Sequence, residues 1–370
     1  ATKTRTGTGH YAANLAAALM QLDHEHELVI YCDTQMLDWF ADRRNGHKVA
    51  LKGITFSSAA QRVFWEQARL SHHLRTMDVN LLHSMAFTSP LMGRTRSVVT
   101  VHDLTFVRYP ETLPLSKRIY YQSTFKSSLR RAEKIITISE SMRQEIVSTF
   151  GLDSEDVIAI PIAAGEEFFT PPDRDQTETV LQGLGVRMPY LLTVATLEPR
   201  KNLTVLLQAF DLLKRESDLP HKLVLTGKRG WFTPKNSLVE KILGTRKDII
   251  FTGYVPQQDM PALYAGADLF LFPSLYEGFG IPLLEAFATE VPVIGSDIPV
   301  HREVCGDAAM FVNPRDHAQW SNAILNLLND TQKRKQLKAK GMKRLNDFSW
   351  KKTAERTLEV YGMDEANGKN

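Results

Sequence analysis

Two carboxylates bracket a glycine-containing turn in the segment DLFLFPSLYEGFGIPLLEAFATEVPVIGSD (268–297). Glu277 precedes the turn, Glu285 follows it, and seven residues separate them. The pattern predicts a strand, the turn, a helix and a second strand. Pro282 marks the start of the helix, because proline suits the first helical positions. Carboxylates accept hydrogen bonds from hydroxyl groups, so this pair indicates a polyhydroxylated ligand such as a sugar.

The turn itself has the features of an anion site. Gly278 and Gly280 carry no side chain, so a ligand can approach the backbone. The amides of Gly280 and Ile281 would point outward with the positive end of the helix dipole, which favours a diphosphate. Together with the carboxylates, this predicts a nucleotide sugar. The alternative is that Glu285 only stabilises a helix start and Glu277 is a solvated loop residue.

A second motif, VATLEPRKNLTVLLQAF (194–210), places adjacent cations between an apolar strand and an amphipathic helix. Arg200 and Lys201 would lie at the carboxyl end of a parallel strand, where doubly wound sheets bind ligands. There they can neutralise a leaving diphosphate. Exposed surface charge is the alternative interpretation.

These motifs need a scaffold of parallel strands, and the chain contains it. Short β-rich runs alternate with amphipathic stretches, which is typical of α/β sheets covered by helices. The expected strands are 27–32, 80–84, 97–101, 134–139 and 157–161 in the first half, and 189–195, 222–227, 249–254, 268–273, 291–295 and 308–312 in the second. A chain of 370 residues exceeds one ordinary core. We therefore expect an N-terminal domain over 1–170, a C-terminal domain over 171–349, and a last helix within 350–370.

Composition excludes several classes of protein. Apolar residues make up 43% and charged residues 24%, and the net charge is +3, which gives no reason to expect a nucleic-acid partner. Only Cys32 and Cys305 are present, without metal-site spacing, and no run is long enough to span a membrane. We expect a cytoplasmic protein. The chain opens with ATKTRTGTGH, a glycine loop without a preceding strand, which favours a native chain that begins upstream.

Three weaker signals leave alternatives open. Gly7, Gly9 and Ala12 have dinucleotide-loop spacing, and Asp33 follows at the end of a predicted strand, which would suit a nicotinamide-dependent enzyme. His102 and Asp103 follow an apolar strand directly, so they are either site residues or a structural corner. The segment 112–134 carries cations over 117–131 interleaved with aromatic residues, which fits either a solvated helix or contact with an anionic membrane, at the inner face if the protein is cytoplasmic.

The segment EGFGIPLLE is similar to the E-x7-E signature of retaining family-4 glycosyltransferases with the GT-B fold. The resemblance implies two Rossmann-like domains with an interdomain cleft, the N-terminal domain on the acceptor side and the C-terminal domain binding the nucleotide sugar. It assigns Glu277 to the donor sugar and Glu285 to the ribose. The turn between them would bind the donor through Gly278, Phe279, Gly280 and Ile281.

Other segments resemble the same family. EPRKN resembles the segment whose basic residues clamp the donor phosphates, which assigns that role to Arg200 and Lys201. RTGTGHY resembles the family's first glycine loop, with Gly9 nearest the ligand. The residue matching His102 contacts the donor sugar, with Asp103 beside it. FTGYVPQQDMPALYAGAD resembles the region that receives the base, where Tyr254 and Val255 are candidates. The last helix is expected to cross back onto the first domain.

The reaction implied by the resemblance moves a hexose, mannose by preference, from a nucleoside diphosphate to a hydroxyl acceptor with retention. GDP-mannose is favoured over UDP-sugars as the donor, and no metal or other cofactor is expected. One candidate acceptor is a lipid-linked oligosaccharide of surface polysaccharide synthesis, and the alternative is a small molecule or a sugar phosphate. The alternatives are a nicotinamide-dependent Rossmann enzyme, which leaves both motifs unused, and a non-catalytic scaffold that binds the sugar nucleotide.

Overall fold

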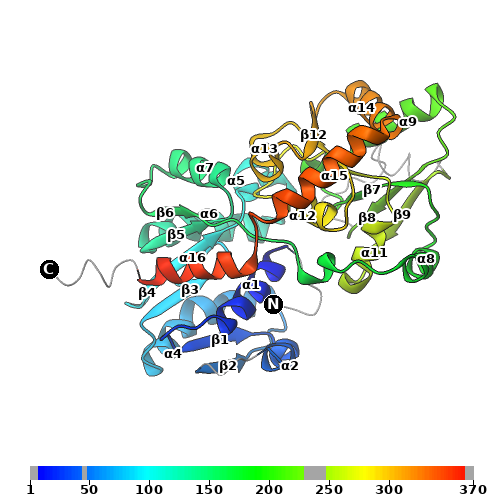
Figure 1. Cartoon of the computed structure of the whole chain (residues 1–370). Coiled ribbons are helices and arrows are strands. Elements are labelled where there is room, and N and C mark those ends of the chain that lie inside the picture. Colours follow the sequence, from blue (N-terminus) through cyan, green and yellow to red (C-terminus); the bar gives the residue numbers. More distant parts are fainter. Residues whose placement is uncertain (1–6, 44–47, 229–246, 363–370) are drawn as a thin grey trace. The chain divides into compact units, whose positions relative to one another are not determined.

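The structure is a computed structural model, and it describes residues 7–43, 48–228 and 247–362. It divides the chain into two compact units (Figure 1). The first unit comprises 1–104, 115–163 and 348–370, and the second comprises 105–114 and 164–347. Both contain parallel sheets covered by helices, as the sequence predicts for an α/β chain.

The first unit contains a four-stranded parallel sheet in the order β3-β4-β5-β6 and a parallel pair β1-β2. The strands are β1 (Leu28–Cys32), β2 (Val49–Gly53), β3 (Leu81–Ser84), β4 (Arg96–Val101), β5 (Lys134–Thr137) and β6 (Val157–Ala159). The helical elements are α1 (Gly7–Gln21), η1 (Thr34–Met36), α2 (Leu37–Ala41), α3 (Ala59–Phe64), η2 (Trp65–Arg69), α4 (Leu70–Thr76), α6 (Leu115–Arg131), α7 (Glu140–Phe150) and α16 (Trp350–Gly362).

Five of these strands confirm the sequence prediction, but β2 was missed. Its side chains are partly or fully exposed, and it ends in Lys52 and Gly53, so it has no apolar run to reveal it. Pairing with β1 makes it a strand, which is a tertiary effect on a weak local pattern.

The second unit is one six-stranded parallel sheet in the order β12-β11-β10-β7-β8-β9. The strands are β7 (Tyr190–Val194), β8 (Lys222–Thr226), β9 (Ile249–Gly253), β10 (Leu269–Phe272), β11 (Val293–Ser296) and β12 (Ala309–Val312). The helical elements are α5 (Thr105–Arg108), η3 (Pro110–Thr112), η4 (Glu166–Phe169), α8 (Arg174–Gly183), η5 (Pro199–Lys201), α9 (Leu203–Glu216), η6 (Gln257–Asp259), α11 (Met260–Ala265), α12 (Ile281–Ala288), α13 (Pro299–Cys305), α14 (His317–Asn329) and α15 (Thr331–Leu345).

This order is the Rossmann order. From the centre of the sheet, β7, β8 and β9 follow one another toward one edge, and β10, β11 and β12 follow one another toward the other edge. The strand order reverses between β7 and β10, which lie side by side and parallel, with Leu191 opposite Leu269. The central strands are buried on both faces, which explains why they read as continuous apolar runs. Helix α9 buries Leu203, Leu206 and Phe210 at helical spacing against this sheet.

The division between the units differs from the expected one. It falls between 163 and 164 rather than between 170 and 171, because η4 packs its Phe168 ring 5.7 Å from that of Tyr264 in the second unit. The segment 105–114 also belongs to the second unit, although its sequence neighbours belong to the first.

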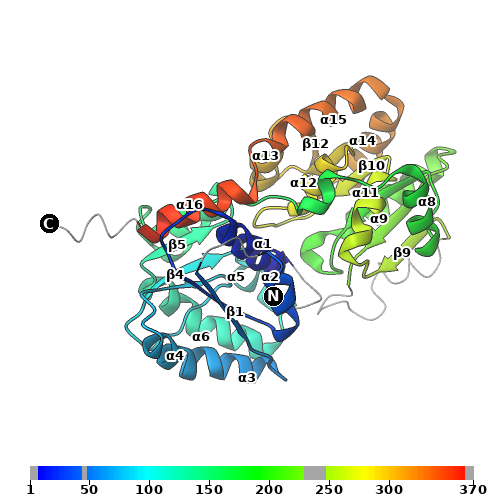
Figure 2. The ribbon, with the colours of Figure 1, turned by 60° about the horizontal axis from the view of Figure 1, so that its bottom comes forward.

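Helix α16 belongs to the first unit and lies beside α1, far from it in sequence (Figures 1 and 2). Thr353 donates a hydrogen bond to the Pro161 carbonyl at 2.8 Å. The Tyr361 hydroxyl lies 2.6 Å from Nδ1 of His83. The last helix is therefore held to this unit by buried polar contacts as well as by its apolar face.

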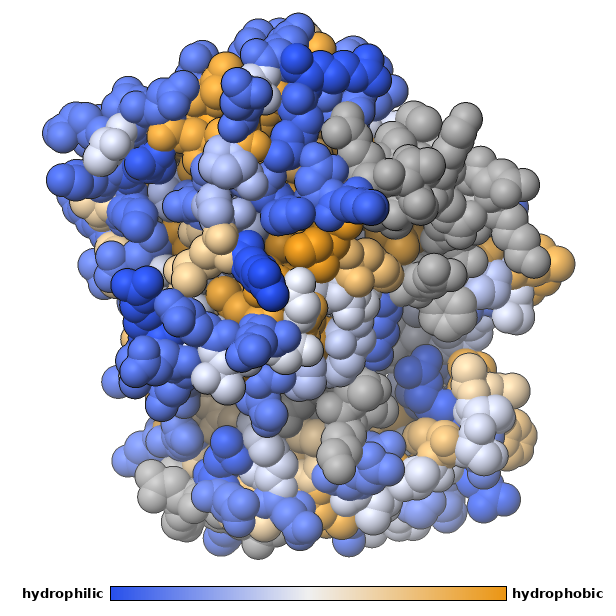
Figure 3. Space-filling model, turned by 90° about the vertical axis from the view of Figure 1, so that its right-hand side faces the viewer, coloured by the Kyte–Doolittle hydropathy of each residue, from blue (hydrophilic) through white to orange (hydrophobic). Residues whose placement is uncertain are grey.

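Hydrophilic residues cover most of the face seen in Figure 3, and hydrophobic residues are interspersed among them. Within the described residues, no helix combines the length and the apolar character that crossing a bilayer requires.

Candidate functional site

The fold brings the two strongest sequence motifs together at the point where the strand order reverses. Arg200 and Lys201 follow β7, and Glu277 follows β10, the adjacent strand. Because the carboxyl ends of parallel strands share one edge of the sheet, the two loops must meet there. The backbone amide of Leu275 donates to the Arg200 carbonyl at 2.8 Å, which joins the loops directly.

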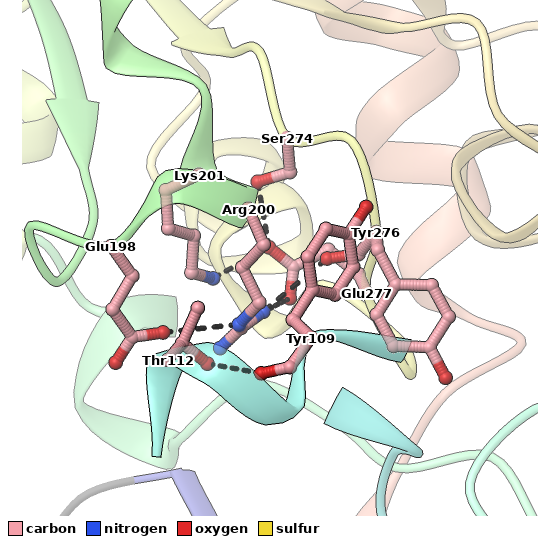
Figure 4. Close-up of polar contacts among 8 residues, drawn as sticks. All are labelled: Tyr109, Thr112, Glu198, Arg200, Lys201, Ser274, Tyr276 and Glu277. Atoms are coloured by element: carbon pink, nitrogen blue, oxygen red, sulfur yellow. Dashed lines mark hydrogen bonds and ion pairs between the residues drawn. The ribbon is translucent and has the colours of Figure 1, made fainter. Parts of the chain in front are cut away.

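A buried ion-pair network occupies this edge (Figure 4). Lys201 Nζ donates to Glu277 Oε1 at 2.5 Å, and Arg200 donates to Glu277 Oε2 at 3.0 Å. Arg200 also binds Glu198 at 3.0 Å. The exposed fractions of these four side chains lie between 9% and 17%, so solvent screens the network little. Two cations and two carboxylates balance here, so a further anion would meet cations that are already paired.

The network determines the protonation state of Glu277. Burial by itself raises the pKa of this carboxyl, but Lys201, Arg200 and two hydrogen bonds outweigh burial and lower the pKa to about 2. Ser274 supplies the second of those hydrogen bonds, at 2.7 Å. Burial and the neighbouring Arg200 also lower the pKa of Lys201. Glu277 is therefore a carboxylate at neutral pH, able to accept hydrogen bonds but not to act as a proton donor.

Three residues that build this site were given no role by the sequence analysis. Ser274 and Glu198 hold Glu277 and Arg200, as described above. Asn202 adopts a left-handed conformation with φ 54° and donates to the carbonyls of Pro273, at 3.0 Å, and Pro314, at 2.6 Å. All three lie inside the two motifs, but only their partners across the sheet edge reveal what they do.

The turn after Glu277 forms as predicted. Helix α12 begins at Ile281, with Gly280 as its N-cap in the left-handed region at φ 98° and Pro282 in the first turn. A side chain at Gly280 would be strained there, and its Cβ would lie 3.0 Å from Leu283. Backbone amides at a helix start have no intrahelical acceptor, so this end of α12 can receive an anion beside Lys201 and Arg200.

The side chains of Phe279 and Val255 are not available to a ligand. Phe279 is 2% exposed and Val255 is 4% exposed, so any contact from these predicted donor-binding residues must come from their backbone. Tyr254 is 44% exposed, and the Lys228 ammonium lies 4.6 Å from the centre of its ring. Gly278 and Gly280 are buried in the turn.

Glu285 lies one helical turn beyond the helix start, in a different environment. Its pKa is raised to about 7, chiefly by burial and in smaller part by the nearby Glu167, and a hydrogen bond from the Tyr264 hydroxyl at 2.7 Å opposes the rise. Glu167 is itself held by Gln257 at 2.7 Å. The two motif carboxylates therefore have opposite protonation tendencies, although the sequence presents them alike.

This difference predicts an effect on stability. A carboxyl whose pKa is raised on folding stabilises the protein at acid pH, and that contribution is lost as the pH rises from the unfolded value of about 4.3 through about 7. Glu285→Gln removes the cost of holding an ionised carboxyl in a buried position. We therefore expect it to raise the free energy of unfolding by on the order of 2 kcal/mol at about pH 8 and by much less at about pH 4.5. Thermal unfolding at both pH values measures this. Glu290→Gln, at an exposed site after the same helix, is the control, and a gain equal at both pH values would contradict the assignment.

In the first unit, His102 is 7% exposed and follows β4 as expected. Its Nε2 lies 2.8 Å from the Met85 carbonyl, which can only accept, so Nε2 carries the proton and Nδ1 keeps its lone pair. Burial lowers the pKa of His102, while the Met85 contact and Asp103 oppose the change. The ring is therefore a neutral hydrogen-bond acceptor at Nδ1. The sugar-binding roles of His102 and of the partly exposed Asp103 stay predictions.

Gly7 and Gly9 are the first residues of α1, and the residues before them lie outside the described ranges. Asp33 caps η1 by accepting the amide of Gln35 at 3.0 Å. Asp33 therefore serves as a helix cap, which removes the acidic residue that the dinucleotide interpretation requires. The ligand contact expected of Gly9 stays a prediction.

Segment 105–114 contributes to the second unit beside the ion-pair network. The ring of Tyr109 lies 6.0 Å from that of Tyr276, the residue before Glu277 (Figure 4). The Tyr276 carbonyl accepts a hydrogen bond from Arg200 at 3.3 Å. The chain thus passes from His102 and Asp103 into a segment that packs next to Glu277, a connection that no local sequence pattern indicates.

Comparisons with known proteins agree with this geometry. Residues 5–163 match the model of Glycosyltransferase Family 4, and residues 182–344 match that of Glycosyl transferases group 1. The chain is 32% identical to the O-antigen chain mannosyltransferase B of Escherichia coli, over 97% of this chain and 96% of the relative. It is 26% identical to the O-antigen chain mannosyltransferase RfbU of Salmonella typhimurium, over 88% of each chain.

A solved structure shares the fold. The Anabaena protein Alr3699/HepE, in complex with UDP and glucose, superposes with a TM-score of 0.73 at 17% identity, covering 98% of this chain and 97% of that one. Two Rossmann-like units, the paired motifs at the strand reversal and a full-length relative above 30% identity lead to one assignment. The chain belongs to the family-4 glycosyltransferases of the GT-B fold, and mannosyltransferases are among its relatives.

Proposed function

We propose that this protein transfers mannose from GDP-mannose to a hydroxyl group of a sugar chain, with retention of the anomeric configuration. The observation that carries the proposal is the Arg200–Lys201–Glu277 network beside the start of α12. It combines cations and backbone amides for a diphosphate with a permanent carboxylate for sugar hydroxyls. The mannose assignment is supported by the O-antigen mannosyltransferases to which the chain is similar.

Catalysis in this proposal comes from stabilising the departing diphosphate. Negative charge develops on the leaving phosphate as the sugar bond breaks, and Arg200, Lys201 and the first amides of α12 are held where they can neutralise it. Cationic side chains can do this work in place of a divalent ion, so we propose a metal-independent reaction. Glu277 orients the donor sugar, and the acceptor attacks from the face that the phosphate leaves. The phosphate assists removal of the acceptor proton.

Glu285 would receive the ribose. Its carboxylate accepts the hydroxyl groups of the ribose best when ionised, so the raised pKa makes donor affinity sensitive to pH near neutrality. Tyr254, exposed at the end of β9, is proposed to lie against the base, with Val255 contributing through its backbone. Gly9, His102 and Asp103 are proposed to complete donor binding.

A transfer assay with a panel of donors tests the proposal. We expect mannose transfer from GDP-mannose to mannose oligosaccharides, much slower transfer from UDP-glucose and ADP-glucose, an α-linked product, and no loss of rate with a chelator. A β-linked product would contradict retention. A transfer that requires added metal would contradict the charge-neutralisation mechanism, and use of UDP-glucose alone would change the donor.

The acceptor is proposed to be a lipid-linked oligosaccharide at an anionic membrane surface. Helix α6 supports this, because Leu115 and Ile119 are 69% and 56% exposed one turn apart. Arg118, Lys126 and Arg130 are exposed along the same helix. Exposed apolar side chains flanked by cations are what an interfacial helix presents to anionic lipid.

Vesicle binding checks this surface. We expect the protein to sediment with vesicles containing phosphatidylglycerol, to dissociate as salt rises, and to ignore neutral phosphatidylcholine vesicles. Arg118→Ala combined with Lys126→Ala should weaken the association on the order of 30-fold, at about 1 kcal/mol for each cation. Lys338→Ala, an exposed lysine of α15, is the control. Equal binding to neutral vesicles would contradict the proposed surface.

A further inference from the structure

We propose that Phe87, with Tyr120 and Tyr121, forms a platform that binds a pyranose ring of the acceptor's sugar chain beside His102. The proposal rests on the proposed function and adds the residues that recognise the acceptor. All four residues belong to the first unit, so the site is built within one compact body. We refer to the three aromatic residues as the aromatic platform.

The backbone of Phe87 is the first observation. Its φ is 63°, in the left-handed region that suits glycine or asparagine. The other non-glycine residues with positive φ in the described ranges are Asp78, Asn202 and Glu290, and Phe87 is the aromatic one. This conformation costs on the order of 1 kcal/mol and is kept by a hydrogen bond from the Phe87 amide to the Thr100 carbonyl at 2.9 Å. Strain of this kind is retained where it places a group for function.

The ring contacts show what the conformation achieves. The centre of the Phe87 ring lies 5.6 Å from that of His102 and 5.7 Å from that of Tyr121, both in edge-to-face geometry. The Tyr121 ring lies 5.5 Å from that of Tyr120. The rings therefore form a row that starts at His102. All three members of the platform are partly exposed, so the row is not part of the buried core.

The far end of the row is fixed by hydrogen bonds. The Tyr120 hydroxyl lies 3.0 Å from the Thr88 hydroxyl and accepts from Gln67 at 3.4 Å. Gln67 also accepts the Leu91 amide at 3.0 Å. Gln67 lies in η2, a π-helical turn, and such turns are frequent at functional sites. The tyrosine at this end is thus held by the loop that carries Phe87.

Charged groups lie near one ring of the aromatic platform, that of Tyr121. Arg62, Glu66 and Asp103 all act electrostatically on Tyr121, while burial is the largest influence and raises its pKa. A pyranose presents an apolar C–H face and a rim of hydroxyl groups. Aromatic rings bordered by a guanidinium and carboxylates match both parts, since the rings pack on the C–H face and the charged groups bond the hydroxyls. The mixed charge of the rim favours a neutral sugar over a phosphate.

The position beside His102 identifies the ligand as the acceptor. His102 is proposed to contact the donor sugar, and the acceptor hydroxyl must lie against that sugar in order to attack it. A second sugar-binding surface that adjoins His102 is therefore suited to the acceptor. Loss of its rings should raise the acceptor KM and leave the donor KM unchanged.

Phe87→Gly tests the platform because it removes the ring and also suits the left-handed backbone. We expect the KM for mannose oligosaccharides to rise about tenfold, as loss of one aromatic packing contact implies. Phe87→Tyr should restore the wild-type KM.

Tyr121→Leu should raise the acceptor KM by itself, and the double variant should show less than the sum of the two effects because the rings touch. Phe64→Ala, which removes an exposed aromatic ring of α3, is the matched control.

Two outcomes would overturn the inference. One is an unchanged acceptor KM in both Phe87→Gly and Tyr121→Leu, and the other is an equal rise for donor and acceptor. If the wild-type protein transfers no mannose, the proposed function fails separately. Calorimetric titration of a mannose oligosaccharide into wild type and Phe87→Gly then still decides the inference, because it requires binding that the variant weakens.

Discussion

Lys201→Ala is expected to lower kcat about 100- to 1000-fold, the range typical of removing one group that stabilises developing negative charge in an active site. Lys201 Nζ uses one of its three protons on Glu277, so others can reach a donor phosphate. Its exposed fraction is 11%, so its charge acts in a weakly screened environment. The measurement is steady-state transfer from GDP-mannose.

The fold of the Lys201 variant must be checked at the same time. Arg200 still pairs with Glu277 at 3.0 Å, so we expect the variant to stay folded, with a loss of up to about 3 kcal/mol of unfolding free energy from the broken buried pair. Lys338→Ala on α15 serves as the charge control for activity as well. Turnover within about threefold of wild type would remove Lys201 from the mechanism, since no charge-stabilising role is that small.

Glu277→Gln is expected to separate diphosphate binding from sugar transfer. The substitution removes the counterion that holds Arg200 and Lys201, so GDP should bind more tightly than to wild type. Transfer should fall at least about 100-fold, because the amide no longer orients the donor sugar as the carboxylate does. Calorimetry with GDP and steady-state transfer with GDP-mannose measure the two quantities.

Stability provides a third measurement on the same variant. Two buried cations without their shared carboxylate repel each other, so the ligand-free variant should lose about 3 kcal/mol of unfolding free energy, as breaking a buried ion pair does. GDP should restore the loss because its phosphates replace the carboxylate. Glu198→Gln is the matched control, since Glu198 accepts a hydrogen bond from Arg200 Nε, whereas Glu277 accepts from both Arg200 and Lys201. It should tighten GDP binding with a smaller loss of transfer. Weaker GDP binding by Glu277→Gln would contradict the charge balance described for the site.

Much of the architecture was predictable from local patterns. The strands of the second unit were predicted correctly because they are buried on both faces and therefore consist of unbroken apolar residues. The start of α12 was predictable because Gly280 and Pro282 specify a turn and a helix by their own backbone preferences. Strand β2 was not predictable, since its exposed alternating residues form a strand only by pairing with β1.

The candidate site divides in the same way. The residue types and spacing of Glu277, Glu285, Arg200 and Lys201 already indicated a phosphate and a sugar, because those depend on what each side chain can bond. The sequence by itself did not distinguish the two carboxylates. Contact with two cations lowers the pKa of Glu277 to about 2, and burial beside Tyr264 raises that of Glu285 to about 7.

Tertiary structure also decided which distant segments meet. The reversal of strand order between β7 and β10 joins loops about eighty residues apart, as the Arg200–Glu277 contact shows. Segment 105–114 packs beside Tyr276, and the left-handed backbone of Phe87 turns its ring toward His102. Local sequence determines what each residue can do chemically and which element it favours. Partners, burial and therefore protonation depend on the packing of elements far apart in the chain, and only the folded structure specifies them.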